Sequence, residues 1–391
     1  MIRQVATWTG RLATALLVCS AAVCAPAGAQ TQSQTGDARK LGFLMPLTGG
    51  SAKLGQMMME GATLAVDEIN AAGGVAGKRV TLIAEDSQAL AKQGIDGFRK
   101  LVDIDRTDII ITGWTAVVVA IAPLAERSKT YLLSASTASP SVRGVSPYFQ
   151  ASWMFDDETV KLLLPYAKNT LKIQRLAVLT VVSDLGISLT ASARNEWKKN
   201  DGALVAEESH QLAETNFRPT LLKLLGNKPD AVYLTSSNGK QLAQIIRQAR
   251  DLGYKGAFIS HGWFEDPELL TIGDHAEGSY YTSPAYDPAG GDPQTKRFVE
   301  SFQKRYQRVP NVHQANHYDL IYLYKTAAEG LAKQGKPVTG SGLREYVVAN
   351  LGQYRGASGR YVFNFTDGSV RRSSIIKTVK GGKFVKIGAL D

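Results

Sequence analysis

From Lys40 onward the chain alternates short apolar runs with amphipathic stretches, and the two patterns predict different elements. Within 54–72, Met58, Ala62, Ala65, Val66 and Ile69 recur at spacings of three and four, which predicts a helix with one buried face. In the first part of the chain we expect strands over 41–45, 80–84, 109–112 and 131–133, and helices over 54–72, 94–103 and 117–127. Strands separated by helices of this length are typical of parallel sheets built from βαβ units.

The same alternation is repeated after a break at Asp156-Asp157. There we expect strands over 176–182, 204–207, 231–235, 257–259 and 278–282, and helices over 160–169, 188–199, 218–225 and 240–252. Two helices follow, over 295–306 and 314–333, and then hairpin strands over 360–365, 374–379 and 384–387. The pattern predicts two α/β units in series, followed by helices and a hairpin tail.

The first 29 residues have the features of a secretory signal. Arg3 and Arg11 flank the start of an apolar run over 12–23, and small residues ending in Ala27-Gly28-Ala29 follow it. We expect cleavage before Gln30 and export to the periplasm. No later stretch reaches the roughly 18 apolar residues that a membrane-spanning helix needs.

Both cysteines, Cys19 and Cys24, lie within that segment, so the mature chain has no thiol for a disulfide or a metal site. Either cysteine could accept a lipid, but Val18 and Val23 precede them where lipidation favours a small residue. We therefore expect a free periplasmic protein, with a lipoprotein as the alternative.

The basic balance raises the question of nucleic acid binding. Residues 1–29 hold two arginines and no acid, so their removal lowers the net charge from +10 to +8. The remaining Lys and Arg residues are spread along the chain without a run of five. This distribution indicates a solvated basic surface and no nucleic acid partner.

The common signatures of enzymes are missing. The stretch 73–79 lacks the spacing of a phosphate loop, 49–53 fails as a nucleophile elbow, and no G-x-G-x-x-G follows a strand. His313 and His317 lie one helical turn apart, as zinc ligands would, but the glutamate of H-E-x-x-H is absent. We expect no catalysis, no metal and no cofactor, and a surface or interlobe role for the two histidines.

Hydroxyl-rich loops follow two neighbouring strands. Trp114-Thr115-Ala116 comes after the strand at 109–112 and opens a helix, and the loop 134–139 follows the next strand. In a parallel sheet ligands bind at the carboxyl ends of strands, where helix N-termini present free N–H groups to an oxyanion. Ordinary helix capping by Ser and Thr remains the alternative interpretation.

Several stretches resemble the leucine/isoleucine/valine-binding family of periplasmic ABC-importer proteins. The opening Gly42-Phe-Leu-Met-Pro-Leu-Thr-Gly49, with Gly55, Gly61 and 65–78, carries the resemblance most specifically. It continues through 122–126, 229–233, 248–253 and Tyr318-Asp319, and covers essentially all of residues 39–391.

The resemblance implies a type I periplasmic binding protein: two Rossmann-like α/β lobes with parallel central sheets, a three-crossing hinge and a ligand cleft between the lobes. We expect crossings near Phe155, Pro284 and Tyr354. The expected segments are 1–29 as signal peptide, 39–155 and 285–354 in the first lobe, and 156–284 and 355–391 in the second.

By resemblance, Thr115 falls where the family holds the ligand carboxylate, and Ser136 and Thr137 fall on the second carboxylate loop. Leu54 and Leu185 replace aromatic walls, and the second-lobe aromatic position falls at Asn238 or Ser237. The acid that pairs with a ligand ammonium should lie near 260–263, where His261 stands and no acid is found; Glu265 and Asp266 are close by.

We therefore expect a monomeric binding protein that delivers a small hydrophobic amino acid or related carboxylate to an ABC permease. The expected ligand-binding residues are Leu54, Trp114, Thr115, Ala116, Ser136, Thr137, Trp153, Asn238 and His261. The missing ammonium partner favours, as an alternative, an amine-free acid or amide, with Trp114, Trp153 and Trp263 as walls. A ligand-sensing module of the same fold is a rival, although the sequence ends soon after the last expected strand.

Overall fold

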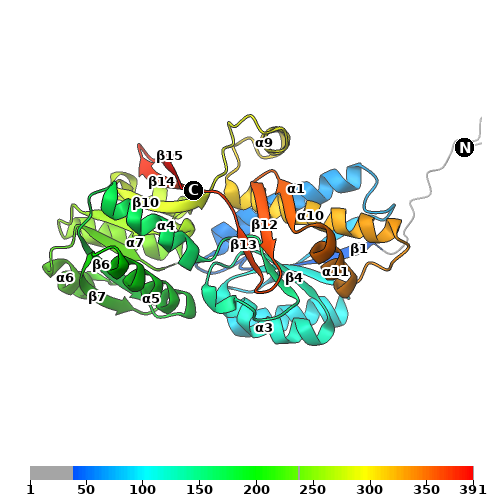
Figure 1. The fold of residues 1–391 in the computed structure, drawn as a ribbon, viewed down its shortest axis with the longest axis horizontal. Coiled ribbons are helices and arrows are strands. Elements are labelled where there is room, and N and C mark those ends of the chain that lie inside the picture. Colours follow the sequence, from blue (N-terminus) through cyan, green and yellow to red (C-terminus); the bar gives the residue numbers. More distant parts are fainter. Residues whose placement is uncertain (1–37, 237, 391) are drawn as a thin grey trace, which may run out of the picture. The chain divides into compact units, whose positions relative to one another are not determined.

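The computed structural model describes residues 38–236 and 238–390, in which two main sheets are flanked by helices (Figure 1). The expected signal peptide, both cysteines and Ser237 lie outside the described residues. No described helix is both long enough and apolar enough to cross a membrane.

Lobe 1 is built on a five-stranded sheet of order β2-β1-β3-β4-β5, in which every neighbouring pair is parallel. Its strands are β1 (Arg39–Met45), β2 (Val80–Asp86), β3 (Ile109–Gly113), β4 (Tyr131–Ser136) and β5 (Phe149–Ala151). Its connecting elements are α1 (Ala52–Ala71), α2 (Ala91–Arg99), the π-helical turn η1 (Lys100–Ile104), α3 (Thr115–Ser128) and the 3-10 turn η2 (Pro140–Val142).

Lobe 2 is built on a seven-stranded sheet of order β15-β14-β10-β9-β8-β6-β7. Its parallel strands are β6 (Arg175–Val181), β7 (Ala203–His210), β8 (Ala231–Leu234), β9 (Ala257–Ser260) and β10 (Ser279–Pro284). Its helices and 3-10 turns are α4 (Asp156–Asn169), α5 (Asp184–Lys199), α6 (Arg218–Gly226), α7 (Gly239–Asp251), η3 (Gly262–Phe264), α8 (Pro267–Leu270) and η4 (Gly273–Ala276).

After β10 the chain returns to lobe 1 through α9 (Pro293–Tyr306), α10 (Val312–Lys333) and α11 (Gly340–Asn350). Helix α10 packs so closely on α1 that a Cβ added at Gly61 would lie only 2.1 Å from the carbonyl oxygen of Gln314. The two-lobed α/β fold expected from the alternating pattern is thereby confirmed.

The tail divides between the two lobes. A three-stranded antiparallel sheet forms from β11 (Gln353–Gly356), β12 (Gly359–Asn364) and β13 (Ser369–Arg371). It lies against the edge of lobe 1, where the N–H of Ala151 donates to the carbonyl of Gly368 over 2.9 Å. Only β14 (Ser374–Lys380) and β15 (Lys383–Leu390) then pair, antiparallel, with lobe 2.

The chain passes between the lobes at residues 152–155, 285–292 and 372–373. The first two segments adjoin the positions expected at Phe155 and Pro284. The third lies beyond the position expected at Tyr354, because β11–β13 cover the short edge strand β5 before the chain joins the other sheet. One apolar cluster runs from the core of lobe 1 through Trp153, Phe155 and Trp263 to the α4–α5 side of lobe 2.

Candidate functional site

A cavity of about 220 Å³ lies between lobe 1 and lobe 2, at the carboxyl ends of their parallel strands. This edge is where ligands bind to open parallel sheets. The lobe 1 lining consists of Gly50, Ser51, Gln88, Ala89, Leu90, Trp114, Thr115, Ala116, Ser136 and Ala138. The lobe 2 lining consists of Val181, Ser183, Asp184, Leu185, Leu212, Ser236, Asn238 and Trp263.

A second hollow, of about 420 Å³, lies at the amino ends of β1 and β3. Charged side chains such as Arg39, Lys78 and Asp108 line it. Because the loops at this edge do not carry the helix N-termini of the βα units, the interlobe cavity is the stronger candidate for a ligand site.

The turn from β3 into α3 brings Trp114 to the cavity in an unusual backbone conformation. Its φ and ψ are 63° and 129°, outside the regions that bulky residues favour. The N–H of Trp114 donates to the carbonyl of Ser136 over 2.9 Å, and a Cβ at Gly113 would lie 2.3 Å from the Ser136 hydroxyl oxygen. Such strain is common at binding sites and persists where the surroundings enforce it.

Helix α3 begins at Thr115 directly beside the cavity. No side chain within the described residues caps this helix at Trp114, so its first N–H groups are free of a side-chain acceptor. Thr115 and Ala116 both line the cavity. An uncapped N-terminus next to a hydroxyl group is suited to an anionic oxygen.

Ser136, at the end of β4, is buried and lines the same cavity. Its Oγ is 3.5 Å from Nε2 of His317, whose Nδ1 donates to the carbonyl of His313 over 2.8 Å. With the proton on Nδ1, Nε2 is the acceptor, but 3.5 Å is the outer limit of a hydrogen bond. The Ser136 hydroxyl can therefore turn to a stronger acceptor, such as a carboxylate.

The structure thus brings Trp114, Thr115, Ala116, Ser136 and Asn238 together around one cavity. Leu185 and Trp263, considered as walls from the sequence, also line it. Asn238 caps α7 by accepting from the N–H of Gln241 over 3.1 Å. A Cβ at Gly50 would lie 2.2 Å from Nδ2 of Asn238, so this glycine allows lobe 2 to approach lobe 1 closely.

Four expected residues are not among those that line the cavity: Leu54, Thr137, Trp153 and His261. Leu54 is buried in the core on α1, and the Thr137 hydroxyl accepts from Ser134 over 2.8 Å. His261 is buried, with Nδ1 3.8 Å from the carboxylate of Asp156. Their side chains are directed to neighbours within the protein, and a role for them in ligand binding stays a prediction.

Sequence reasoning did not select several residues of the lining, among them Ser51, Gln88, Ser183, Asp184, Leu212 and Ser236. A usable signal was present, because most of them follow the carboxyl ends of β1, β2, β6, β7 and β8. Gln88 and Ala89 also have positive φ values of 49° and 61°, which a sequence pattern does not reveal for these residue types.

An aromatic stack between the lobes forms one side of the site. Trp263 of lobe 2 lies 5.3 Å from Trp114, 6.1 Å from Trp153 and 5.8 Å from His313, measured between ring centroids. The rings of Trp153 and His313 are stacked almost parallel to each other, with an interplanar angle of 5° and centroids 4.9 Å apart. Trp263 is therefore held by lobe 1 on one side and borders the cavity on another.

The residues that line the cavity carry little charge. Among the described lining residues none is basic, and Asp184, exposed in the first turn of α5, is the one acid. Glu265 pairs with Lys377 and accepts from the Ser283 hydroxyl over 3.1 Å, while Asp266 caps α8. Neither Glu265 nor Asp266 lines the cavity.

Burial shifts the pKa values of the titratable groups behind the cavity in the direction that favours their neutral forms. Burial lowers the pKa of His261, His313 and His317 to about 3. It also raises the pKa of Asp156 well above the usual range for a carboxyl group. The surface role expected for His313 and His317 does not fit this burial. His313 contacts Trp263 of lobe 2, as the interlobe alternative expects, whereas His317 contacts Ser136 within lobe 1. The described residues include no group of three or more His, Cys, Asp or Glu placed to hold a metal.

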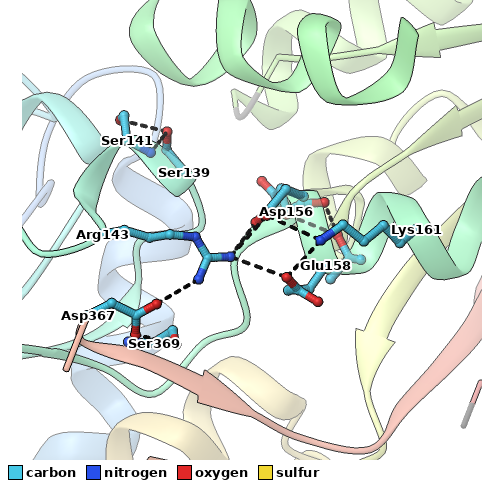
Figure 2. Close-up of polar contacts among 10 residues, drawn as sticks. Ser139, Ser141, Arg143, Asp156, Glu158, Lys161, Asp367 and Ser369 are labelled. Carbon is cyan, nitrogen blue, oxygen red and sulfur yellow. Dashed lines mark hydrogen bonds and ion pairs between the residues drawn. The ribbon is translucent and has the colours of Figure 1, made fainter. Parts of the chain in front are cut away.

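Ion pairs join lobe 1 to the start of α4, next to the first crossing (Figure 2). Arg143 pairs with Asp157 over 2.8 Å and Glu158 over 3.4 Å, in the first turn of α4, and with Asp367 over 3.1 Å, in the β12–β13 turn. A second, buried cluster places the Arg372 guanidinium 3.2 Å from the Ser152 carbonyl. The first and third crossings are thus bonded to each other.

Comparison with known proteins gives consistent matches. A family described as periplasmic binding protein matches residues 39–383. An amino acid binding protein of Pseudomonas aeruginosa is 25% identical over 270 residues, which cover 67% of this chain and 71% of that protein. The Leu/Ile/Val-binding protein of Escherichia coli K12 is 24% identical over 272 residues, which cover 68% and 73%.

Two solved structures show the same fold. A leucine binding protein of Thermotoga maritima superposes with a TM-score of 0.82 at 24% identity, over 90% of this chain and 98% of that one. A solute binding protein of R. palustris, in complex with benzoate, superposes with a TM-score of 0.79 at 18% identity, over 90% and 96%.

Proposed function

We propose, from the premise that the chain belongs to the periplasmic binding protein family, that it captures a small solute for an ABC importer. The observation that carries the proposal is the cavity lined by both lobes at the carboxyl ends of their strands. Relatives of similar length are named for the binding of amino acids, and similarly folded proteins are described as ABC transporter solute binding proteins.

Binding would proceed in two steps. The N–H groups at the start of α3, with the Thr115 and Ser136 hydroxyls, take the anionic end of the ligand. Lobe 2 then closes over the ligand by bending at the three crossings, bringing Leu185, Asn238 and Trp263 against it. The closed protein delivers the ligand to the permease.

The ligand class is a small hydrophobic amino acid or a related carboxylate. Apolar side chains such as Ala89, Ala138, Val181 and Leu185 form much of the wall, which favours a ligand with an apolar body. Benzoate and isoleucine are both found in proteins of this fold. An amine-free acid or amide therefore remains the alternative to an amino acid.

Relatives in this family are binding proteins, and we propose that this chain likewise performs no catalysis. We propose further that it is exported through residues 1–29, that the mature protein begins near Gln30 without a lipid, and that it is monomeric. Mass spectrometry of the protein from a periplasmic extract tests the export step. A lipid on Cys19 or Cys24 would contradict a lipid-free mature protein. Light scattering measures the molar mass and so tests the monomeric state.

A thermal-shift screen of amino acids, amides and organic acids tests the binding function directly. A ligand at a hundred times its Kd should stabilise the folded state by about 2.7 kcal/mol. The absence of any stabilisation by amino acids or carboxylates would contradict the proposed function. A ligand-sensing module of the same fold would also bind, so reconstitution of uptake with a permease distinguishes the two.

A further inference from the structure

The cavity has two indole walls, which come from opposite lobes. Trp114 and Trp263 both line it, with ring centroids 5.3 Å apart and an interplanar angle of 37°. Both are largely buried, with 8% and 2% of their surface exposed. An aromatic ring placed beside such walls gains offset-stacked or edge-to-face contacts that a saturated group of equal size does not.

Contacts within the protein hold both indoles in position. The backbone of Trp114 is fixed by its hydrogen bond to Ser136, despite the unfavourable φ of 63°. Trp263 is stacked on Trp153 and His313, and a Cβ at Gly262 would lie 2.7 Å from the Trp153 ring. Rigid walls lose little side-chain entropy when a flat ligand binds against them.

Two hydrogen-bond donors at the cavity have no protein acceptor in the described part of the chain. The start of α3 offers free N–H groups, and the indole N–H of Trp263 has no acceptor among the described residues. The positive end of a helix favours an anion and disfavours a cation next to it. An α-amino acid whose carboxylate bound here would place its ammonium beside these donors.

Acids that could compensate an ammonium are committed elsewhere or exposed. Glu265 is paired with Lys377, and Asp266 caps α8 next to Gly239. Asp184 is the one acid among the described residues that line the cavity, and it is exposed in the first turn of α5. A buried ammonium without a close anion is strongly unfavourable.

From these observations we infer that the ligand is an aromatic carboxylate without an ammonium group, with its ring against Trp114 and Trp263 and its carboxylate at the start of α3. The inference rests on the proposed function, because it names the solute that the same cavity takes.

Calorimetry with the mature protein tests each part through matched pairs of ligands. Benzoate against cyclohexanecarboxylate isolates the aromatic ring, and we expect benzoate to bind roughly two- to tenfold more tightly. For the ammonium, 3-phenylpropanoate is compared with phenylalanine, and 4-methylpentanoate with leucine. We expect the amine-free member of each pair to bind at least tenfold more tightly, because the other member buries an uncompensated charge.

Variants assign the effect to the residues named. Trp263→Leu should abolish the preference for benzoate over cyclohexanecarboxylate, while Trp263→Phe, which keeps an aromatic wall, should retain it. Asp184→Asn removes the one acid among the described lining residues, and the amine-free member of each pair should still bind more tightly than the amino acid.

The outcomes separate this inference from the proposed function. If leucine binds more tightly than 4-methylpentanoate, and Asp184→Asn weakens the binding of leucine, the inference is overturned and the binding function stays intact. Equal binding of benzoate and cyclohexanecarboxylate would overturn the aromatic part. If none of the six compounds binds, the inference is overturned and the proposed function loses its support as well.

Discussion

Ser136 and Thr115 are the hydroxyl residues that we propose bind the anionic end of the ligand. Ser136 is the last residue of β4, and Thr115 comes two residues after the end of β3. Their position in the fold is therefore fixed by the strand ends and by the hydrogen bond between Trp114 and Ser136. Both also line the cavity. Helix capping would be the alternative use of such hydroxyls, but no described side chain caps α3.

Replacing either hydroxyl should weaken ligand binding and leave the fold intact. Thr115→Ala and Ser136→Ala each remove a donor to a charged group, which is worth roughly 1.5–3 kcal/mol. We expect the Kd of the ligand found in the screen to rise about tenfold to a hundredfold, as measured by calorimetry. Circular dichroism should show unchanged secondary structure. Wild-type affinity in both variants would return these hydroxyls to a structural role.

The sequence predicted some of the residues that line the candidate cavity. Hydroxyls at strand ends are visible in a sequence, because strand, loop and helix follow one another in a fixed order. The direction of a side chain is not visible: Thr137 follows Ser136 directly, yet its hydroxyl accepts from Ser134 and does not line the cavity. The position of Asp184 depends on the approach of lobe 2, which no local pattern records.

At the scale of elements, α1 and α10 pack through a glycine contact that allows little change. A Cβ at Gly61 would lie 2.1 Å from the carbonyl oxygen of Gln314, and backbone atoms cannot rotate away. Gly226, at the end of α6, has no atom within 4 Å of the same constructed position. Gly226 therefore provides the matched control for a substitution of Gly61.

Gly61→Ala should destabilise the protein, because the added methyl forces the two helices apart. We expect a loss of about 1–3 kcal/mol in the free energy of unfolding, the usual cost of overpacking. Gly226→Ala should instead raise it by about 0.4–1 kcal/mol, by restricting the unfolded chain. Urea unfolding followed by circular dichroism measures both. An equal effect of the two substitutions would show that the α1–α10 contact can relax.

Most elements could be predicted from periodicity, because βαβ units place their signals in adjacent stretches of sequence. The expected helix over 94–103 is α2 followed by the π-helical turn η1, a change of winding that hydrophobic spacing does not resolve. The allocation of β11–β13 to lobe 1 depends on the contact between Gly368 and Ala151, which are 217 residues apart. Long-range pairing of this kind leaves no local signal.

At the scale of the whole molecule, the joint between the lobes contains buried neutral histidines. His313, from lobe 1, stacks against both Trp153 and Trp263, and neither of its ring nitrogens has a partner among the described residues. Burial, with a smaller contribution from the charge of Lys377, lowers its pKa to about 3. The contact between the lobes at His313 therefore favours the neutral imidazole.

This arrangement predicts a dependence of stability on pH. The usual pKa of histidine is 6.5, so between pH 6.5 and about 3 the unfolded chain binds a proton at His313 that the folded chain does not. Stability must then fall as the pH falls through this window, by up to about 1.4 kcal/mol per pH unit for each such histidine. His261 and His317 contribute with the same sign. Asp156 acts in the opposite sense, because its raised pKa lets the folded state hold a proton that the unfolded state loses.

The substitution His313→Phe isolates one of these terms while keeping a ring in the stack. At pH 7.5 we expect the variant to be as stable as wild type or more so, since it removes two buried nitrogens without partners. Between pH 6 and pH 4.5 the stability of wild type should fall more steeply, by up to about 1.4 kcal/mol per pH unit. Urea unfolding at several pH values measures the difference between the two proteins, in which Asp156 and the other histidines cancel. Parallel curves would show that His313 takes up its proton equally in the folded and unfolded states, and that the aromatic stack does not exclude water from it.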